Sequence, residues 1–164
     1  MLRTFRSVLN KPANTMNKFD GEFCMIEMDA WTGMVVVVDE ENGTVRFPSE
    51  VMVSNFSFLD KERVPTGLNT ARGDMSDYEE DFNLIVHGER VKVVNFLPET
   101  DVFGTDQFDP TVQVENWLVA TTNGKLRAKF PEEEIKPIYQ CVGFYDDNGH
   151  TLCMVKKREG YLVK

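Results

Sequence analysis

The sequence predicts a mainly β protein with two small barrels in tandem, and three observations lead to this prediction. Asn-Gly pairs at 42–43, 123–124 and 148–149 each separate two strand-like stretches. Both residues tolerate positive φ, so the pair is typical of the tight turn of a β-hairpin. Apolar and polar residues alternate around these turns, as in strands with one buried face. The order strand, Asn-Gly, strand, Phe-Pro occurs twice, at 35–53 and 117–138.

The turns define three predicted hairpins. They pair Val35–Asp39 with Thr44–Phe47, Trp117–Thr121 with Lys125–Phe130, and Val142–Asp146 with Thr151–Lys156. A further strand precedes each of the first two hairpins, at Glu22–Asp29 and Arg90–Phe96. We interpret the repeated order as an internal duplication; the alternative is two unrelated hairpins that share their turn chemistry.

The chain divides into five predicted segments. Residues 1–18 form a basic arm or short helix, because Leu2, Phe5, Val8 and Leu9 have helical spacing. This acid-free stretch also has the composition of a mitochondrial presequence. Residues 19–59 and 86–140 form the two barrels, 60–85 an acidic linker, and 141–164 a C-terminal hairpin. The linker contains a predicted helix, since Ser76–Glu79 has the capping-box pattern and Tyr78, Phe82 and Ile85 share one helical face.

Composition excludes several classes of protein. With 164 residues, 41% hydrophobic and 27% charged, the chain is globular rather than disordered. No apolar run approaches the roughly 20 residues that a membrane-spanning helix needs. The three cysteines (Cys24, Cys141, Cys153) have no metal-like spacing. We therefore expect reduced, core-packed thiols in a cytoplasmic protein, with no metal, no cofactor and no membrane partner.

The net charge of −9 is unevenly distributed. Residues 1–18 carry four basic side chains and no acidic one, whereas residues 19–85 carry 15 acidic and 4 basic side chains. This charge excludes a uniformly basic nucleic-acid coat but is compatible with a local basic face. The asymmetry predicts that the two halves of the chain contact different partners.

Residues 86–140 resemble the SH3-like small barrels of the KOW and Tudor type. The resemblance lies in Gly88–Val94 (GERVKVV), which opens the unit, and in Phe130–Ile138 (FPEEEIKPI), which closes it. Residues 19–58 resemble a more divergent copy. The resemblance implies a non-enzymatic binding module, since KOW domains bind nucleic acid or polymerase and Tudor domains bind methylated side chains through aromatic cages. Phage early DNA-associated KOW proteins of the MotB kind are similar in size.

A row of cations is the strongest functional signal in the residues themselves. Lys125, Arg127 and Lys129 share one face of a predicted strand, because side chains alternate along a strand. Arg90 and Lys92 alternate with valines in the same way. If the two strands are neighbours, five cations line one side of a barrel, and Lys156, Lys157 and Arg158 extend it. Such a row would contact the phosphate backbone rather than read bases. The alternative is a solvated outer face whose charges keep an edge strand from aggregating.

Aromatic and acidic residues suggest two further sites. A possible aromatic cage for a cation consists of Trp31, Phe47, Phe56 and Phe58, although such residues more often form the core of a small barrel. The acidic side chains of residues 39–41, 74–81 and 132–134 could imitate nucleic acid or contact a basic protein. The alternative is an ordinary solubilising surface.

The predicted function is that of a non-enzymatic adaptor. It would bind nucleic acid without sequence preference through the second barrel, DNA more readily than RNA, and a protein partner, basic or related to transcription, through the first. The rival hypothesis is an acidic protein-interaction module or inhibitor of a host factor that binds no nucleic acid. The sequence contains no phosphate-binding glycine loop, nucleophile elbow or HExxH motif, and we predict no catalytic residues. The sequence does not indicate the oligomeric state.

Overall fold

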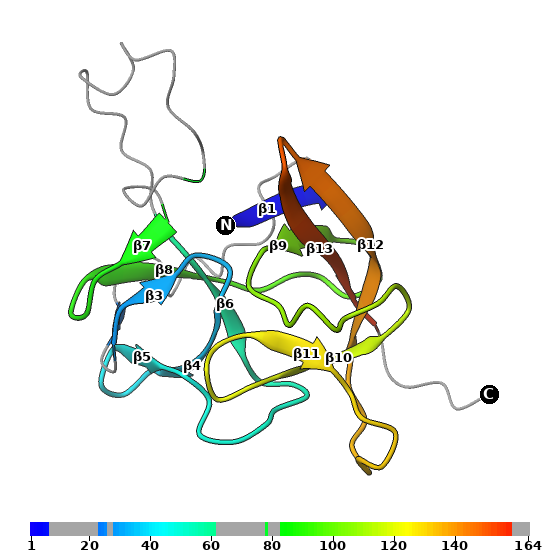
Figure 1. Ribbon diagram of the computed structural model, residues 1–164. Coiled ribbons are helices and arrows are strands. Elements are labelled where there is room, and N and C mark those ends of the chain that lie inside the picture. The colour runs from blue at the N-terminus through cyan, green and yellow to red at the C-terminus, as the bar shows by residue number, and fades with distance from the viewer. Residues whose placement is uncertain (7–22, 26–27, 62–77, 79–82, 159–164) are drawn as a thin grey trace.

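A computed structural model describes residues 1–6, 23–25, 28–61, 78 and 83–158. Every named element in this part of the chain is a strand, so the prediction of a mainly β protein is confirmed. Three sets of strands make up the structure (Figure 1): a five-stranded closed barrel, a six-stranded antiparallel sheet, and a short two-stranded sheet of β3 (Ala30–Trp31) and β7 (Leu84–Ile85).

The closed barrel contains five short strands. Around the barrel they are β2 (Phe23–Met25), β5 (Thr44–Arg46), β4 (Val35–Asp39), β6 (Ser57–Asp60) and β8 (Arg90–Val94). Strands β2 and β5 are parallel, and the other pairs are antiparallel.

The six-stranded sheet lies beside the barrel (Figure 1). Its order is β1 (Leu2–Arg6), β9 (Val102–Thr105), β13 (His150–Lys157), β12 (Tyr139–Asp147), β10 (Trp117–Ala120) and β11 (Leu126–Ala128). The C-terminal hairpin, predicted as a segment separate from the two barrels, is therefore the centre of this sheet.

The two strand groups repeat one order of pairing. The barrel has the order β5-β4-β6-β8-β2, and the sheet has β11-β10-β12-β13-β9. The parallel contact between β2 and β5 also has a counterpart, because Phe108, just after β9, forms a parallel bridge with Leu126 of β11. This correspondence agrees with the duplication suggested by the sequence.

The boundaries of the repeat differ from the predicted ones. Strand β8 was expected to open a second barrel over 86–140, but it pairs with β2 and β6 and completes the first. A second closed barrel over 86–140 is not confirmed. The sequence pattern did not reveal that β8 follows β6 in the repeat, because residues 61–89 separate these two strands in the sequence, whereas only two residues separate the equivalent strands β12 and β13.

Strands β1 and β7 occupy parts of the two segments that were predicted as helical. Leu2–Arg6 pairs with β9, and Leu2 packs against a cluster of buried hydrophobic residues. Ile85 belongs to β7. Backbone pairing at a free sheet edge thus outweighs the helical spacing of the apolar residues. The rest of both predicted helices, apart from Tyr78 and Asn83, lies outside the described residues.

All three predicted hairpins are confirmed, but their turns differ. Only at 148–149 do both residues of the Asn-Gly pair have positive φ, 53° and 88°, as a type I′ turn requires. At the other two turns only the glycine has positive φ, and the loops are longer. In the first, Asp39 Oδ1 accepts hydrogen bonds from the backbone N–H groups of Glu41 and Asn42, both at 3.1 Å.

Two hydrophobic clusters share the strands of the barrel. Residues on one face of β4, β6 and β8 fill the barrel interior, where Val36, Leu59 and Val93 are fully buried. The alternate residues Val35, Phe58 and Val94 pack into a second cluster together with the buried face of the six-stranded sheet. The four consecutive valines of β4 reflect this burial on both faces. This second cluster, to which both strand groups contribute, is the shared core of the protein.

Candidate functional site

A groove with a volume of about 540 Å³ opens where the two strand groups meet. The barrel group lines it from the end of β4, the loop before β6 and the residue after β8. The sheet contributes the first residue of β12 and the last residue of β13. The lining residues are Val38, Glu40, Ser54, Asn55, Phe56, Ser57, Asn95, Ile138, Tyr139 and Lys157.

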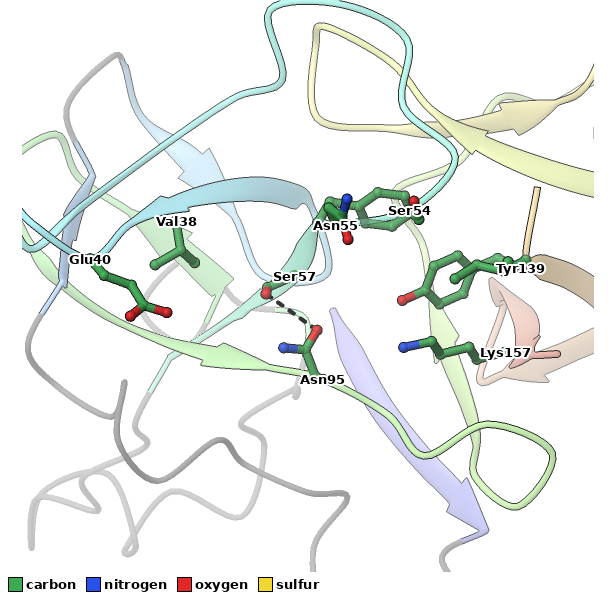
Figure 2. Close-up of a pocket in the computed structure, with 10 residues that line it drawn as sticks. Val38, Glu40, Ser54, Asn55, Ser57, Asn95, Tyr139 and Lys157 are labelled. Atoms are coloured by element: carbon green, nitrogen blue, oxygen red, sulfur yellow. Dashed lines mark hydrogen bonds between the residues drawn. The ribbon is translucent and has the colours of Figure 1, made fainter. Parts of the chain in front are cut away.

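Tyr139 and Lys157 are positioned by the pairing of β12 with β13, in which they are direct cross-strand partners. The Tyr139 ring is buried against Phe56, with 4.9 Å between ring centroids. Lys157 Nζ lies 6.0 Å from the centroid of the Tyr139 ring. The phenol oxygen and the ammonium group point the same way, into the groove (Figure 2). Burial raises the pKa of Tyr139, so its hydroxyl keeps its proton and can donate a hydrogen bond.

Amide and hydroxyl groups form the middle of the groove. Ser57 Oγ donates a hydrogen bond of 3.2 Å to Asn95 Oδ1, which orients the Asn95 amide (Figure 2). Asn55 has a φ of 60°, a left-handed conformation that asparagine adopts more readily than most residues. Its exposed side chain stands at the rim. These groups can donate and accept hydrogen bonds without adding charge.

The groove is electrically polarised. The Glu40 carboxylate lies on one side, and Lys157 with Tyr139 lies on the other (Figure 2). Such an arrangement suits an elongated polar ligand with an anionic group toward Lys157 and hydrogen-bond donors toward Glu40. Within the described residues, no group of three or more His, Cys, Asp or Glu side chains could hold a metal ion.

The predicted row of five cations is not formed. Strand β8, with Arg90 and Lys92, belongs to the barrel, whereas β11 lies at the far edge of the six-stranded sheet. The condition on which the row depended, that these strands are neighbours, is therefore not met. The prediction failed because alternation along a strand says which side chains share a face but not which strand lies beside it.

Arg127 is held by its neighbours rather than presented to solvent. Its guanidinium makes two hydrogen bonds to the Glu133 carboxylate, one of them 3.0 Å long, and lies 4.3 Å from the centroid of the Phe130 ring. Its side chain is only 16% exposed. Lys125 and Lys129 flank it on the same face, Lys125 exposed and Lys129 half-buried. Arg127 thus stabilises the turn after β11.

The C-terminal cations are divided between two environments. Lys156 Nζ and Arg158 Nη1 both contact Glu99 Oε2, at 3.5 and 2.9 Å. Lys157 points to the opposite face of β13, where it lines the groove. Of the eight cations predicted to bind nucleic acid, Lys157 is the one that the structure places in this groove.

The four aromatic residues predicted as a possible cage do not gather around a common space. Phe56 and Phe58 are buried in the shared core, whereas Phe47 is buried inside the barrel with Trp31 packed against that cluster. The core interpretation of these residues is therefore the one that the structure supports.

The ion pair between Arg127 and Glu133 makes a pH-dependent contribution to stability. The hydrogen bonds from Arg127 lower the pKa of Glu133, with a further contribution from the Phe130 backbone N–H. A lowered pKa in the folded state stabilises the protein above the unfolded value of roughly 4.3, and this stabilisation is lost as the pH falls through the folded pKa. We expect Glu133→Gln to lower the free energy of unfolding by about 1 kcal/mol at pH 7. The difference from the wild type should shrink below about pH 4. Urea denaturation at pH 7 and below about pH 4 measures this difference in the free energy of unfolding. If the difference were the same at both pH values, the ion pair would not be its source.

Comparisons of the chain with protein-family models, with curated proteins and with solved structures found no match. In the described part of the chain, no helix has the length and apolar character needed to cross a membrane.

Sequence reasoning missed most of the groove. Tyr139, Asn55 and Asn95 belong to three different segments, and no spacing in the sequence relates them. One weak signal was present, because the polar pair Ser54–Asn55 interrupts apolar residues just before a buried strand. The groove arises from the packing of the two strand groups, which pattern analysis does not determine.

Proposed function

We propose that this protein is a non-enzymatic binding protein that holds a single-stranded segment of nucleic acid in the groove, without strong sequence preference. One observation carries the proposal: Lys157 and the Tyr139 hydroxyl point together into a groove lined by amides and hydroxyls. An ammonium beside a phenol is a suitable pair of donors for a phosphate oxygen.

The remaining groups of the groove suit an unpaired base. The amides of Asn55 and Asn95 can donate to and accept from base edges, and the Glu40 carboxylate can accept from an exocyclic amino group. Single-stranded segments also expose the Watson–Crick edges, whereas a duplex uses these edges in base pairing. With a net charge of −9, the protein repels a polyanion at long range, so we expect weak, strongly salt-dependent binding.

Fluorescence anisotropy with labelled single-stranded DNA, single-stranded RNA and duplex DNA tests the proposal, at about 50 and 200 mM salt. We expect Lys157→Gln to weaken single-strand binding several-fold at the lower salt concentration and to reduce the salt slope by roughly 0.7, the contribution of one phosphate contact on a single strand. Tyr139→Phe, which keeps the buried ring, should weaken binding less.

The matched control is Lys136→Gln, which removes the same charge from an exposed position outside the groove. Arg127→Glu is unsuitable as a test, because it would place an acid against Glu133 and disturb the turn. Equal effects of the two lysine variants, or no binding at 50 mM salt, would contradict the proposal.

A second candidate function is an acidic module that binds a basic protein. The observation that favours it is that three of the cations predicted to bind nucleic acid form ion pairs within the protein. Arg127 pairs with Glu133, and both Lys156 and Arg158 pair with Glu99. Co-precipitation from the native cell, with and without nuclease, distinguishes the two. A partner retained after nuclease treatment supports the protein-binding function, and a partner lost with it supports nucleic-acid binding.

A further inference from the structure

Cys141 and Cys153 lie side by side in the shared core, on the adjacent strands β12 and β13. Their sulfur atoms are 3.5 Å apart, and both residues are fully buried free thiols. The two cysteines are diagonal neighbours rather than direct cross-strand partners, since Cys141 pairs with Val155 and Cys153 with Phe144. A β-bulge between Cys141 and Gly143 shifts the register between these two pairs.

The two thiols are chemically different. The Cys153 thiol donates a hydrogen bond to the Cys141 sulfur, which stabilises a thiolate at Cys141 and lowers the pKa of that group. The same interaction and burial raise the pKa of Cys153. Cys141 is therefore the better nucleophile, and Cys153 is the neighbouring thiol that can react with an oxidised Cys141.

We propose that Cys141 and Cys153 are an oxidation site that forms a reversible disulfide when the protein meets a peroxide. In the first step the Cys141 thiolate attacks one peroxide oxygen, the O–O bond breaks, and a sulfenic acid and hydroxide result. In the second step the Cys153 sulfur attacks the Cys141 sulfur, the S–O bond breaks, and water leaves. Overall two thiols and one hydrogen peroxide give one disulfide and two waters.

The burial of the two thiols determines how fast they are oxidised. Their positions on β12 and β13 determine which part of the protein the disulfide affects. Because both sulfurs are fully buried, the peroxide reaches them only when the hairpin opens locally, so oxidation is slow under native conditions. The product joins the two strands that carry Tyr139 and Lys157, the pair on which the proposed binding site depends. The oxidation itself is independent of the proposed function and is tested without any ligand.

The experiment compares the full chain after treatment with hydrogen peroxide and after treatment with dithiothreitol. We expect oxidation to lower the intact mass by about two units and peptide mapping to recover a fragment that links Cys141 with Cys153. The midpoint of thermal unfolding should rise by roughly 5 °C, since the crosslink restricts the unfolded chain, and should return on reduction.

Two variants serve as controls. Cys24→Ser removes the third cysteine and should leave the crosslink unchanged, whereas Cys153→Val should abolish it. If Cys153→Val does not fold, Cys153→Ala serves the same purpose. Full alkylation of both Cys141 and Cys153 after oxidation and unfolding, or a crosslink to Cys24 instead, would overturn the proposal.

Discussion

Phe58→Ala is expected to lower the free energy of unfolding by about 3–5 kcal/mol, the usual cost of removing a buried aromatic ring. Phe58 is completely buried on β6 between its cross-strand neighbours Val35 and Val94. Its ring also reaches the six-stranded sheet, with centroid distances of 4.6 Å to Phe103 and 5.7 Å to Tyr139. The cavity left by the substitution would therefore weaken the contact between the two strand groups as well as the barrel.

The two tryptophans make this prediction specific. Trp31 packs against the barrel interior, and Trp117 begins β10 in the sheet. In the single-tryptophan proteins Trp31→Phe and Trp117→Phe, fluorescence reports the unfolding of one strand group at a time. Because the groups share one core, we expect both probes to give the same urea midpoint, and Phe58→Ala to shift both midpoints equally.

Phe130→Ala is the matched control, because Phe130 is 50% exposed. This substitution should cost no more than about 1 kcal/mol. Different urea midpoints for the two tryptophan probes, measured with Phe58 in place, would contradict a shared core. A shift of only the Trp31 signal in Phe58→Ala would contradict it as well.

The sequence was sufficient for features that depend on neighbouring residues. All three hairpins follow from their Asn-Gly turns, since a hairpin is formed by residues close together in the chain. A tight two-residue turn forms only at 148–149, where Asp147 and His150 pair directly. At the other two sites, longer loops place only the glycine in the left-handed region.

Pairing between distant strands could not be predicted from the same signals. Val91 and Val93 alternate with Arg90 and Lys92 whether β8 opens a new barrel or closes the previous one. The choice depends on which distant strands β8 pairs with, and this pairing leaves no periodic pattern in the sequence. The same limit explains the site. The sequence shows which residues carry a positive charge. It does not show that Glu99 and Glu133 pair with some of them, or which residues surround Lys157, because tertiary packing determines these contacts.

Gly33→Ala is expected to be the most damaging of the small substitutions, with a loss of about 2–5 kcal/mol. Gly33 has a φ of +90°, in the left-handed region that strains an L side chain. A Cβ atom there would also stand 2.4 Å from Thr105 Oγ1 and 2.6 Å from the backbone oxygen of Met1. Neither distance is possible unless the Thr105 side chain and the Met1 backbone move.

The surroundings of Gly33 have little freedom to move. The Met1 ammonium group is buried and donates hydrogen bonds to the Thr32 carbonyl at 2.6 Å and to Asp106 at 2.7 Å. Thr105 Oγ1 donates to the Gly33 carbonyl at 3.0 Å. These bonds join β1 and β9 of the sheet to the turn before β4 of the barrel. A methyl group at position 33 would push these elements apart and break hydrogen bonds whose polar atoms are buried.

Gly149→Ala separates the two causes of this loss. Gly149 has nearly the same φ, +88°, but no atom beyond its two chain neighbours lies within 4 Å of its ideal Cβ position. It should therefore show the backbone strain alone, about 1–2 kcal/mol. The additional loss in Gly33→Ala, measured by urea denaturation under the same conditions, gives the cost of crowding at the junction. Equal losses in the two variants would mean that β1 yields to the methyl group, and that the contact between the strand groups does not depend on the close approach of Met1 to Gly33.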